Sequence, residues 1–159
     1  GALVICGVFA ALTYLEEKGI VHRDVKAENI LLGEEGKPVL SDFGLAARLD
    51  DEEEMKKRCG SPGYAAPEIV KGHAYNNKVD VFASGVLLYY LLSGSLPFHG
   101  ANITKILRRA LTGRFTFSEA FAHVSPRMKG FITCLLTQNP DKRPCARKAL
   151  HYIRKRWHC

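Results

Sequence analysis

The sequence lacks a run of apolar residues long enough to cross a membrane. The longest run, Val81–Leu92, has 12 residues, whereas a membrane-spanning helix needs about 20. The apolar start, Gly1–Leu12, has neither the basic residues nor the cleavage site of a signal peptide. Since 47% of the 159 residues are hydrophobic, the chain is large and apolar enough for one domain with its own core.

No two cysteines have the Cys-x-x-Cys spacing of a zinc site or a redox motif. The five of them, an odd number, are spread over positions 6, 59, 134, 145 and 159. This pattern favours neither a structural zinc nor a disulfide framework. We therefore expect a reducing compartment, which means a cytoplasmic or nuclear protein.

Acidic residues are scarce after residue 99. Residues 100–159 contain 13 Lys and Arg against 2 Asp and Glu, whereas residues 1–99 contain 10 against 14. The overall charge of +7 and the basic segment Arg154–Arg156 leave nucleic-acid binding open as an alternative. The acidic first part holds the motifs described next, and it suits magnesium and a basic peptide better than a polyanion. We therefore expect neither nucleic acid nor a membrane as a partner.

The most informative segment is His22–Asn29, with the sequence His-Arg-Asp-Val-Lys-Ala-Glu-Asn. It lies between two apolar runs, Gly19–Val21 and Ile30–Leu32, and places an acid, a cation and a second oxygen ligand in one tight loop. These groups suit phosphoryl transfer, in which positioning and charge neutralisation dominate. A lone His-Arg-Asp triplet can also be a solvated turn, so the interpretation depends on the rest of the chain.

Four more motifs follow in the chain: Ser-Asp-Phe-Gly-Leu at 41–45, a segment ending in Ala-Ala-Pro-Glu at 60–68, Asp-Val-Phe-Ala-Ser-Gly at 80–85 and Asn-Pro-Asp-Lys-Arg-Pro at 139–144. Together with the loop His-Arg-Asp-x-Lys-x-x-Asn, they resemble the signature motifs of eukaryotic-type protein kinases. In detail the chain is most similar to the calmodulin-dependent/AMP-activated serine/threonine branch. The resemblance covers nearly the whole chain.

The resemblance implies a mainly α fold with short β hairpins, namely the large C-terminal lobe of a kinase with the small lobe absent, so that residues 1–159 form a partial kinase domain. The hydrophobic pattern predicts a hairpin of Ile30–Leu32 with Pro38–Leu40 and a long ordered loop over residues 43–66. It also predicts helices over residues 2–18, 78–93, 102–111, 126–136 and 143–155. The second of these is expected to be buried on all sides, and the last to begin with Pro144 at its first position.

Asp24, Lys26 and Ser61 are the catalytic candidates. The resemblance implies that Asp24 accepts a hydrogen bond and then the proton of the substrate hydroxyl, and that Lys26 neutralises charge on the phosphoryl group. Ser61 falls where the family has a Ser or Thr that hydrogen-bonds both. Without the resemblance, the three are a turn carboxylate, a surface lysine and a Ser-Pro turn residue.

Asn29, Asp42 and Leu31 are the candidates for binding the cofactors, which the resemblance implies are ATP and Mg²⁺. Asn29 and Asp42 supply the hard oxygen atoms that Mg²⁺ prefers, and Leu31 would lie under the adenine ring. The alternatives are a capped turn for Asn29, a loop acid for Asp42 and an ordinary core leucine for Leu31.

Other residues match supports of the family's active site. The resemblance implies that Phe43 is buried against His22 and that Glu68 and Arg143 form a buried bidentate ion pair. It also implies that Asp80 accepts hydrogen bonds from backbone N–H groups of the His-Arg-Asp turn.

The implied function is transfer of the γ-phosphoryl group of ATP to Ser or Thr of protein substrates. Glu28 matches a position that contacts an Arg upstream of the acceptor, which predicts substrates that are basic there; a solvated Glu is the alternative. The 159 residues contain neither a Gly-rich loop nor a Val-Ala-Ile-Lys segment. We therefore expect the missing small lobe to be a partner and the chain alone to be inactive. A non-catalytic kinase-like lobe, serving as a scaffold or binding module, is the alternative from another class.

Residues 43–60 contain no Ser, Thr or Tyr. The resemblance implies that Arg23 pairs with a phosphate in this segment, but the segment offers five carboxylates instead, Asp50–Glu54. These either form a solvated surface or take the place of the phosphate beside Arg23. The second interpretation predicts an enzyme that needs no phosphorylation in this segment.

Overall fold

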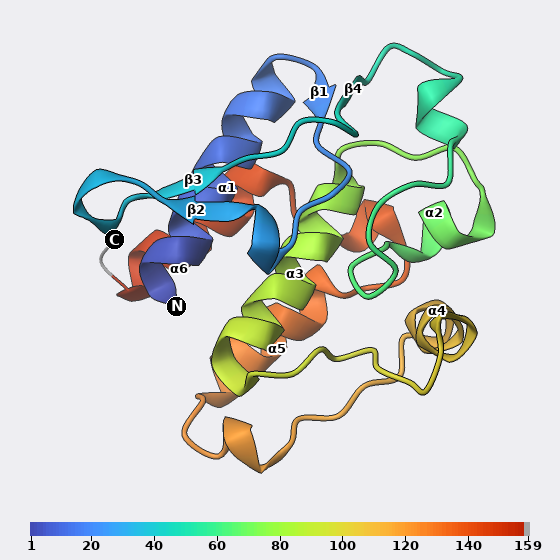
Figure 1. The fold of residues 1–159 in the computed structure, drawn as a ribbon. Coiled ribbons are helices and arrows are strands. Elements are labelled where there is room, and N and C mark those ends of the chain that lie inside the picture. Colours follow the sequence, from blue (N-terminus) through green and yellow to red (C-terminus); the bar gives the residue numbers. More distant parts are fainter. Residues whose placement is uncertain (158–159) are drawn as a thin grey trace.

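A computed structural model describes residues 1–157, which are mainly helical (Figure 1). The helices are α1 (Ala2–Glu17), α2 (Pro67–Lys71), α3 (Lys78–Ser93), α4 (Ile103–Thr112), α5 (Pro126–Leu135) and α6 (Ala146–Trp157). The strands are β1 (Ile20–Val21), β2 (Ile30–Leu32), β3 (Pro38–Leu40) and β4 (Ala47–Arg48). Short 3-10 turns occupy Ala27–Asn29, Glu34–Gly36, Glu54–Lys56, Glu119–Phe121 and Pro140–Lys142. The predicted mainly α fold with short antiparallel strand pairs is confirmed.

Helix α3 forms the centre of the core. Every residue from Val79 to Tyr89 is buried, as the apolar sequence on all sides of this helix predicts. Helices α1 and α5 pack against it (Figure 1). The approach of α5 is close because Gly85 has no side chain: a Cβ atom at this position would lie 2.7 Å from the Cβ atom of Leu135.

Two pairs of strands lie against helix α1 (Figure 1). Strands β2 and β3 form the predicted antiparallel hairpin, with Leu31 opposite Val39. The sequence pattern does not predict the second pair, β1 with β4, because β4 lies inside the long loop and has only two residues. These residues become a strand because β1 offers them a free edge, and the pairing fixes the start of the long loop beside the His-Arg-Asp segment.

The helix starts agree with the sequence pattern for α4 and α5 but not for α6. The side chains of Asn102 and Ser125 each accept a hydrogen bond from a backbone N–H group in the first turn of their helix, so both act as caps. The expected start of the last helix at residue 143, with Pro144 in its first position, is wrong, since α6 begins at Ala146. A residue before proline disfavours the helical conformation, and Arg143 is extended, with φ −75° and ψ 145°.

No helix within residues 1–157 is long and apolar enough to span a membrane. The same residues contain no group of three or more His, Cys, Asp or Glu side chains that could hold a metal ion among themselves.

Candidate active site

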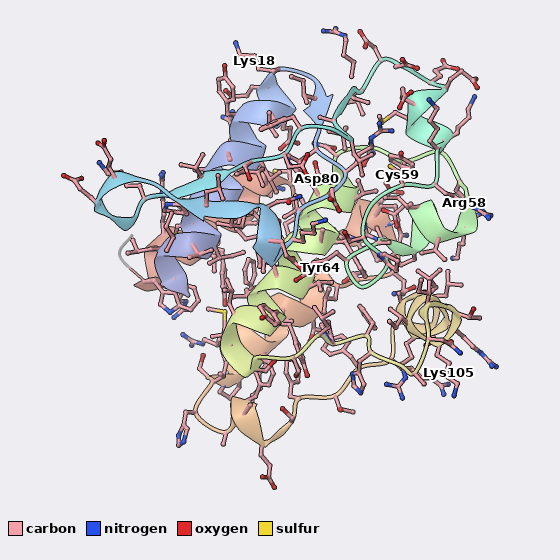
Figure 2. All side chains as sticks on the ribbon, viewed as in Figure 1. Lys18, Arg58, Cys59, Tyr64, Asp80 and Lys105 are labelled. Carbon is pink, nitrogen blue, oxygen red and sulfur yellow. The ribbon has the colours of Figure 1, made fainter. Side chains whose placement is uncertain are left out.

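The segment between β1 and β2 is held in shape by a buried carboxylate from α3 (Figure 2). Asp80 Oδ2 accepts a hydrogen bond from His22 N at 2.7 Å, and Asp80 Oδ1 accepts one from Arg23 N at 2.8 Å. Burial raises the pKa of Asp80, although these two hydrogen bonds act in the opposite direction. Arg23 has a φ of 69°, which is strained for a residue with a side chain. Asp80 thus stabilises an unusual backbone turn, in the role that the sequence predicts.

The Asp24 carboxylate is surrounded by hydrogen-bond donors. Ser61 N and Ser61 Oγ donate to Asp24 Oδ1 at 3.0 and 2.8 Å. Lys26 Nζ lies 2.7 Å from Asp24 Oδ2, and Asn29 Nδ2 donates to the same oxygen at 3.2 Å. Lys26 Nζ also donates to Ser61 Oγ at 2.9 Å. The fold therefore brings the three catalytic candidates into mutual contact, although Ser61 comes from a segment well removed in sequence.

These contacts fix the charges of the two ionisable groups. Burial acts to raise the pKa of Asp24, but the hydrogen bonds from Lys26 and Ser61 outweigh it and lower that pKa. The hydrogen bond to Asp24 in turn raises the pKa of Lys26. Asp24 is thus held as an ionised hydrogen-bond acceptor and Lys26 as a cation.

His22 connects this loop to the Asp-Phe-Gly segment. Its Nδ1 atom accepts a hydrogen bond from Asp24 N at 3.3 Å, and its Nε2 atom lies 3.0 Å from Ser41 O, which assigns the ring proton to Nε2. The rings of His22 and Phe43 meet edge to face, with 4.9 Å between their centroids. The prediction that Phe43 is buried is nevertheless wrong, because 49% of this residue is exposed. His22 covers one side of the ring and the remainder faces solvent.

Asn29 and Asp42 are joined through Ser41. The backbone N and the Oγ atom of Ser41 both donate to Asn29 O at 2.9 Å. Asn29 Nδ2 donates to Asp24 O at 2.8 Å, and the Asn29 side-chain oxygen accepts no hydrogen bond within residues 1–157. Asp42 is exposed, and its Oδ1 atom accepts a hydrogen bond from Gly44 N at 3.2 Å. The two side chains offer the hard oxygen atoms that suit Mg²⁺, which takes few protein ligands when phosphates supply the others.

A comparison with known protein families agrees with the motifs and with these contacts. Residues 2–153 match the protein kinase domain. The chain belongs to the protein kinase family. It is 42% identical over 151 residues to the human serine/threonine-protein kinase H1 and 38% identical over 151 residues to a probable myosin light chain kinase of Dictyostelium discoideum. It is 40% identical over 147 residues to a probable serine/threonine-protein kinase 2 of Plasmodium falciparum. These similarities fit the serine/threonine branch that the motifs resemble.

The match covers most of this chain but less than half of each of these kinases. It includes 91%, 92% and 90% of the chain, in the order given, and 36%, 43% and 29% of the relatives. The similarity therefore establishes a shared kinase domain region, not the activity of a whole relative.

Arg23 ties the kinase activation segment, residues 43–60, to the His-Arg-Asp loop. Its Nη2 atom donates to Glu54 Oε2 at 2.7 Å, and its Nη1 atom donates to Glu54 O at 2.7 Å. Its Nε atom donates to Leu45 O at 2.6 Å. Hydrogen bonds from Lys57 and Arg23 lower the pKa of Glu54. One carboxylate of the acidic run thus lies beside Arg23, as one of the two interpretations of that run predicts.

The other carboxylates of the run make different contacts. Asp50 pairs with Arg48, both exposed. Asp51 Oδ1 accepts a hydrogen bond from Glu54 N at 3.0 Å, and Glu53 pairs with Lys56 at the surface. For these residues the solvated-surface interpretation holds.

Tyr75 completes the Arg23 site, and the sequence pattern does not single it out. Its hydroxyl accepts a hydrogen bond from Arg23 Nη1 at 3.1 Å and lies 3.0 Å from Glu54 O and 2.8 Å from Lys57 O. Burial raises the pKa of Tyr75 to about 12, so the hydroxyl stays protonated and can donate. Tyr75 follows no motif, and only the folded chain places it against the activation segment.

The predicted ion pair of Glu68 and Arg143 is present. Arg143 Nη1 and Nη2 donate to the two Glu68 oxygens at 2.6 and 2.8 Å. The pair is buried, and Arg143 Nε also donates to Thr137 O at 2.7 Å. It anchors the Ala-Pro-Glu motif at residues 66–68, which follows the activation segment, to the chain before α6.

Leu31 and Glu28 lie outside the contacts around Asp24. Leu31 is 56% exposed on β2, so it is not a core residue. Glu28 is exposed and forms no ion pair within residues 1–157. Their roles with adenine and with a substrate arginine stay predictions.

Proposed function

We propose that this chain is the catalytic, large-lobe part of a serine/threonine protein kinase, which transfers the γ-phosphoryl group of ATP to Ser or Thr of protein substrates. The observation that carries the proposal is the contact of Asp24, Lys26 and Ser61. A kinase-like lobe that has become a scaffold has no need to keep an ionised acid, a cation and a hydroxyl in one hydrogen-bonded group.

The Ser61 hydroxyl indicates how a substrate hydroxyl would bind. Ser61 Oγ donates to Asp24 and accepts from Lys26, so a hydroxyl group fits between the acid and the cation. A substrate Ser or Thr in an equivalent position would donate its proton to the Asp24 carboxylate. Lys26 would lie where charge develops on the transferred phosphoryl group.

The oxygens of Asn29 and Asp42 would hold Mg²⁺. When bound, the ion would neutralise charge on the ATP phosphates. Asn29 is orientated for this by its two hydrogen bonds to Asp24, which direct the amide nitrogen inward. Leu31 would supply one apolar surface for the adenine ring.

The substrate would be basic upstream of the acceptor. Glu28 supports this preference, because it is an exposed carboxylate close enough to Lys26 and Tyr64 to affect the pKa of each. A guanidinium there would form a charge-assisted hydrogen bond with a carboxylate that has no other partner in residues 1–157. A cytoplasmic or nuclear location, inferred from the cysteine pattern, is part of the same proposal.

The test uses the extended chain, meaning these 159 residues joined to a kinase small lobe. Peptides that differ only in a central Ser, Thr or Tyr are incubated with γ-labelled ATP and Mg²⁺, with and without EDTA. We expect label on the Ser and Thr peptides, none on the Tyr peptide, and none in EDTA. No transfer to any peptide, from a chain that is folded and binds Mg-ATP, would favour the non-catalytic scaffold.

A further inference from the structure

A large basic cavity lies away from the candidate active site. It is open to solvent, has a volume of about 1030 Å³ and is lined by helix α4, the loop over residues 95–101 and the segment over residues 114–118. Four cationic side chains line it, namely Lys105, Arg108, Arg109 and Arg114, and no carboxylate does. The kinase mechanism proposed above uses none of them.

The cations of this cavity are not neutralised by the protein. None of the four forms an ion pair within residues 1–157. Arg109 Nη1 donates to His99 O at 2.8 Å, which leaves its charge uncompensated. All four side chains are exposed, so they are free to bind an anion.

The placement of the cations follows from the helix. Lys105, Arg108 and Arg109 are spaced by three and four residues, so they share one face of α4. Figure 2 shows Lys105 at the edge of this helix, with further nitrogen-tipped side chains around it. Gly113 ends α4 with a φ of 65°, a conformation that favours glycine, and Arg114 follows directly. The turn thus adds a fourth cation to the group.

The wall of the cavity toward the core is apolar and fixed. The rings of Tyr89 and Phe115 are perpendicular, with 6.0 Å between their centroids. The Tyr89 hydroxyl donates to Thr116 O at 2.8 Å, which ties the segment over residues 114–118 to α3. Pro97 also lines the cavity. A ligand of this cavity therefore meets both positive charge and an apolar surface.

The cavity adjoins the segment over residues 60–68, which contains the catalytic candidate Ser61 and which we take as the candidate substrate-binding loop. Gly63 of that loop packs against Leu96, because a Cβ atom on Gly63 would lie 2.8 Å from Leu96 Cδ1. The neighbours of Leu96 on both sides, Ser95 and Pro97, line the cavity. A protein bound at the loop can therefore reach the cavity with a nearby segment.

We propose that this cavity binds an acidic segment of the protein substrate, as a second recognition site beside the phosphorylated residue. The inference rests on the proposed function, which makes the bound protein a substrate. Charge complementarity with the four cations is the reason why the bound segment is acidic. The volume is at the upper end of the roughly 300–1,000 Å³ typical of small-molecule sites, so several residues fit, not a single anion. The substrate would then carry basic residues near Glu28 and acidic residues near α4.

A peptide fits the site better than a nucleic acid does. A nucleic acid would need a track of cations along its backbone. The other basic run, Arg154–Arg156, belongs to the end of α6, which lies on the opposite side of the molecule from α4 (Figure 1). The two clusters do not join into a track, and the apolar wall offers contacts to side chains between the carboxylates.

The binding test uses the 159-residue chain and needs no catalysis. The probe is a fluorescein-labelled octapeptide of alternating Asp and Glu with one central Phe, followed by fluorescence anisotropy. The pocket variant is Lys105→Gln with Arg108→Gln; the matched control, with the same change in net charge, is Arg154→Gln with Lys155→Gln. Thermal melts check that both variants are folded. We expect the pocket variant to bind about tenfold more weakly, as the loss of two charge contacts implies, and the control to bind as the original chain does.

Three results would overturn the proposal. The first is equal weakening by both variants, which indicates a general charge effect. The second is equally tight binding of a peptide with Asn and Gln in place of the acids. The third is an oligonucleotide of eight nucleotides that binds more tightly than the acidic peptide and loses affinity in the pocket variant.

A kinetic test separates this inference from the proposed function. With the extended chain, a substrate peptide that carries an acidic tail should have a lower KM than one with an amide tail, at unchanged kcat. The pocket variant should abolish the difference in KM. If the extended chain has no activity, the proposed function fails, while the anisotropy measurement still decides whether the cavity binds acidic peptides.

Discussion

Arg23 donates a hydrogen bond to the Glu54 carboxylate at 2.7 Å, and this contact joins the residue before Asp24 to the activation segment. Arg23 is buried, and its strained backbone also places Asp24. A carboxylate carries a charge of −1, less than the charge of about −2 on a phosphate. Glu54 nevertheless gives Arg23 a permanent anionic partner in a segment with no residue that could be phosphorylated.

The first prediction concerns this pair. In the extended chain, Glu54→Gln should lower the rate of peptide phosphorylation by roughly tenfold, which corresponds to about 1.4 kcal/mol, because Arg23 loses its charged partner. The cleavage of residues 43–60 by a protease should become faster. Glu53→Gln is the control, since Glu53 contacts only Lys56 at the surface. An unchanged rate and cleavage pattern in Glu54→Gln would mean that the whole acidic run is only a solvated surface.

The second prediction concerns the pH dependence of catalysis. Ser61→Ala removes a hydrogen bond that lowers the pKa of Asp24, while the burial that raises it remains. The pKa of Asp24 therefore rises, and a base that must be ionised becomes protonated at a higher pH. The acidic limb of the kcat profile should move to higher pH in Ser61→Ala and stay in place in Ser61→Thr, which keeps the hydroxyl. A limb that does not move would show that Ser61 does not affect the reacting carboxylate.

The third prediction concerns the ion pair that anchors the Ala-Pro-Glu motif at residues 66–68. Glu68→Gln leaves the buried Arg143 without its charged partner, and the free energy of unfolding should fall by about 3–5 kcal/mol. Glu17→Gln breaks the exposed pair with Arg147 and should change the free energy of unfolding by less than about 1 kcal/mol. Urea denaturation of the 159-residue chain measures both. Similar losses for the two variants would contradict the importance of burial here.

The fourth prediction concerns the contact of α3 with α5. Gly85→Ala places a Cβ atom 2.7 Å from Leu135 Cβ, so the core must shift, at a cost of about 1–3 kcal/mol. Gly130→Ala is the matched control, because a Cβ atom there meets nothing within 4 Å and Ala favours a helix by about 1 kcal/mol. Thermal unfolding should show a lower midpoint for the first variant and a higher one for the second. A stabilised Gly85→Ala would contradict the tight packing.

The sequence predicts those parts of the fold that depend on local chemistry. The residues of α3 are apolar on all sides, and its range, Lys78–Ser93, agrees with the pattern. The hairpin of β2 and β3 follows from two apolar runs around a glycine-containing turn. The contacts among Asp24, Lys26 and Ser61 follow from motifs, because each residue has a fixed place in a known order of signatures.

The parts that the sequence does not predict depend on distant contacts. Strand β4 forms only because β1 is beside it. Tyr75 reaches Arg23 across many residues, and its surroundings contain no motif.

Two further differences have local causes. The ring of Phe43 contacts His22 on one side only, so the rest of it stays exposed. Helix α6 is shorter because Pro144 disfavours the helical conformation at Arg143.

The most direct test of the proposed kinase activity is the effect of Asp24→Asn on phosphoryl transfer in the extended chain. The change keeps the shape of the side chain and removes the charge that would accept the substrate proton. We expect the rate to fall by about 10²–10⁴-fold, with an intact fold, which a thermal melt of the extended chain checks, and with retained binding of Mg-ATP. Asp50→Asn, which alters an exposed carboxylate paired with Arg48, should keep the full rate. An Asp24→Asn variant that retains most of its phosphoryl transfer would contradict the assignment of Asp24 as the catalytic base.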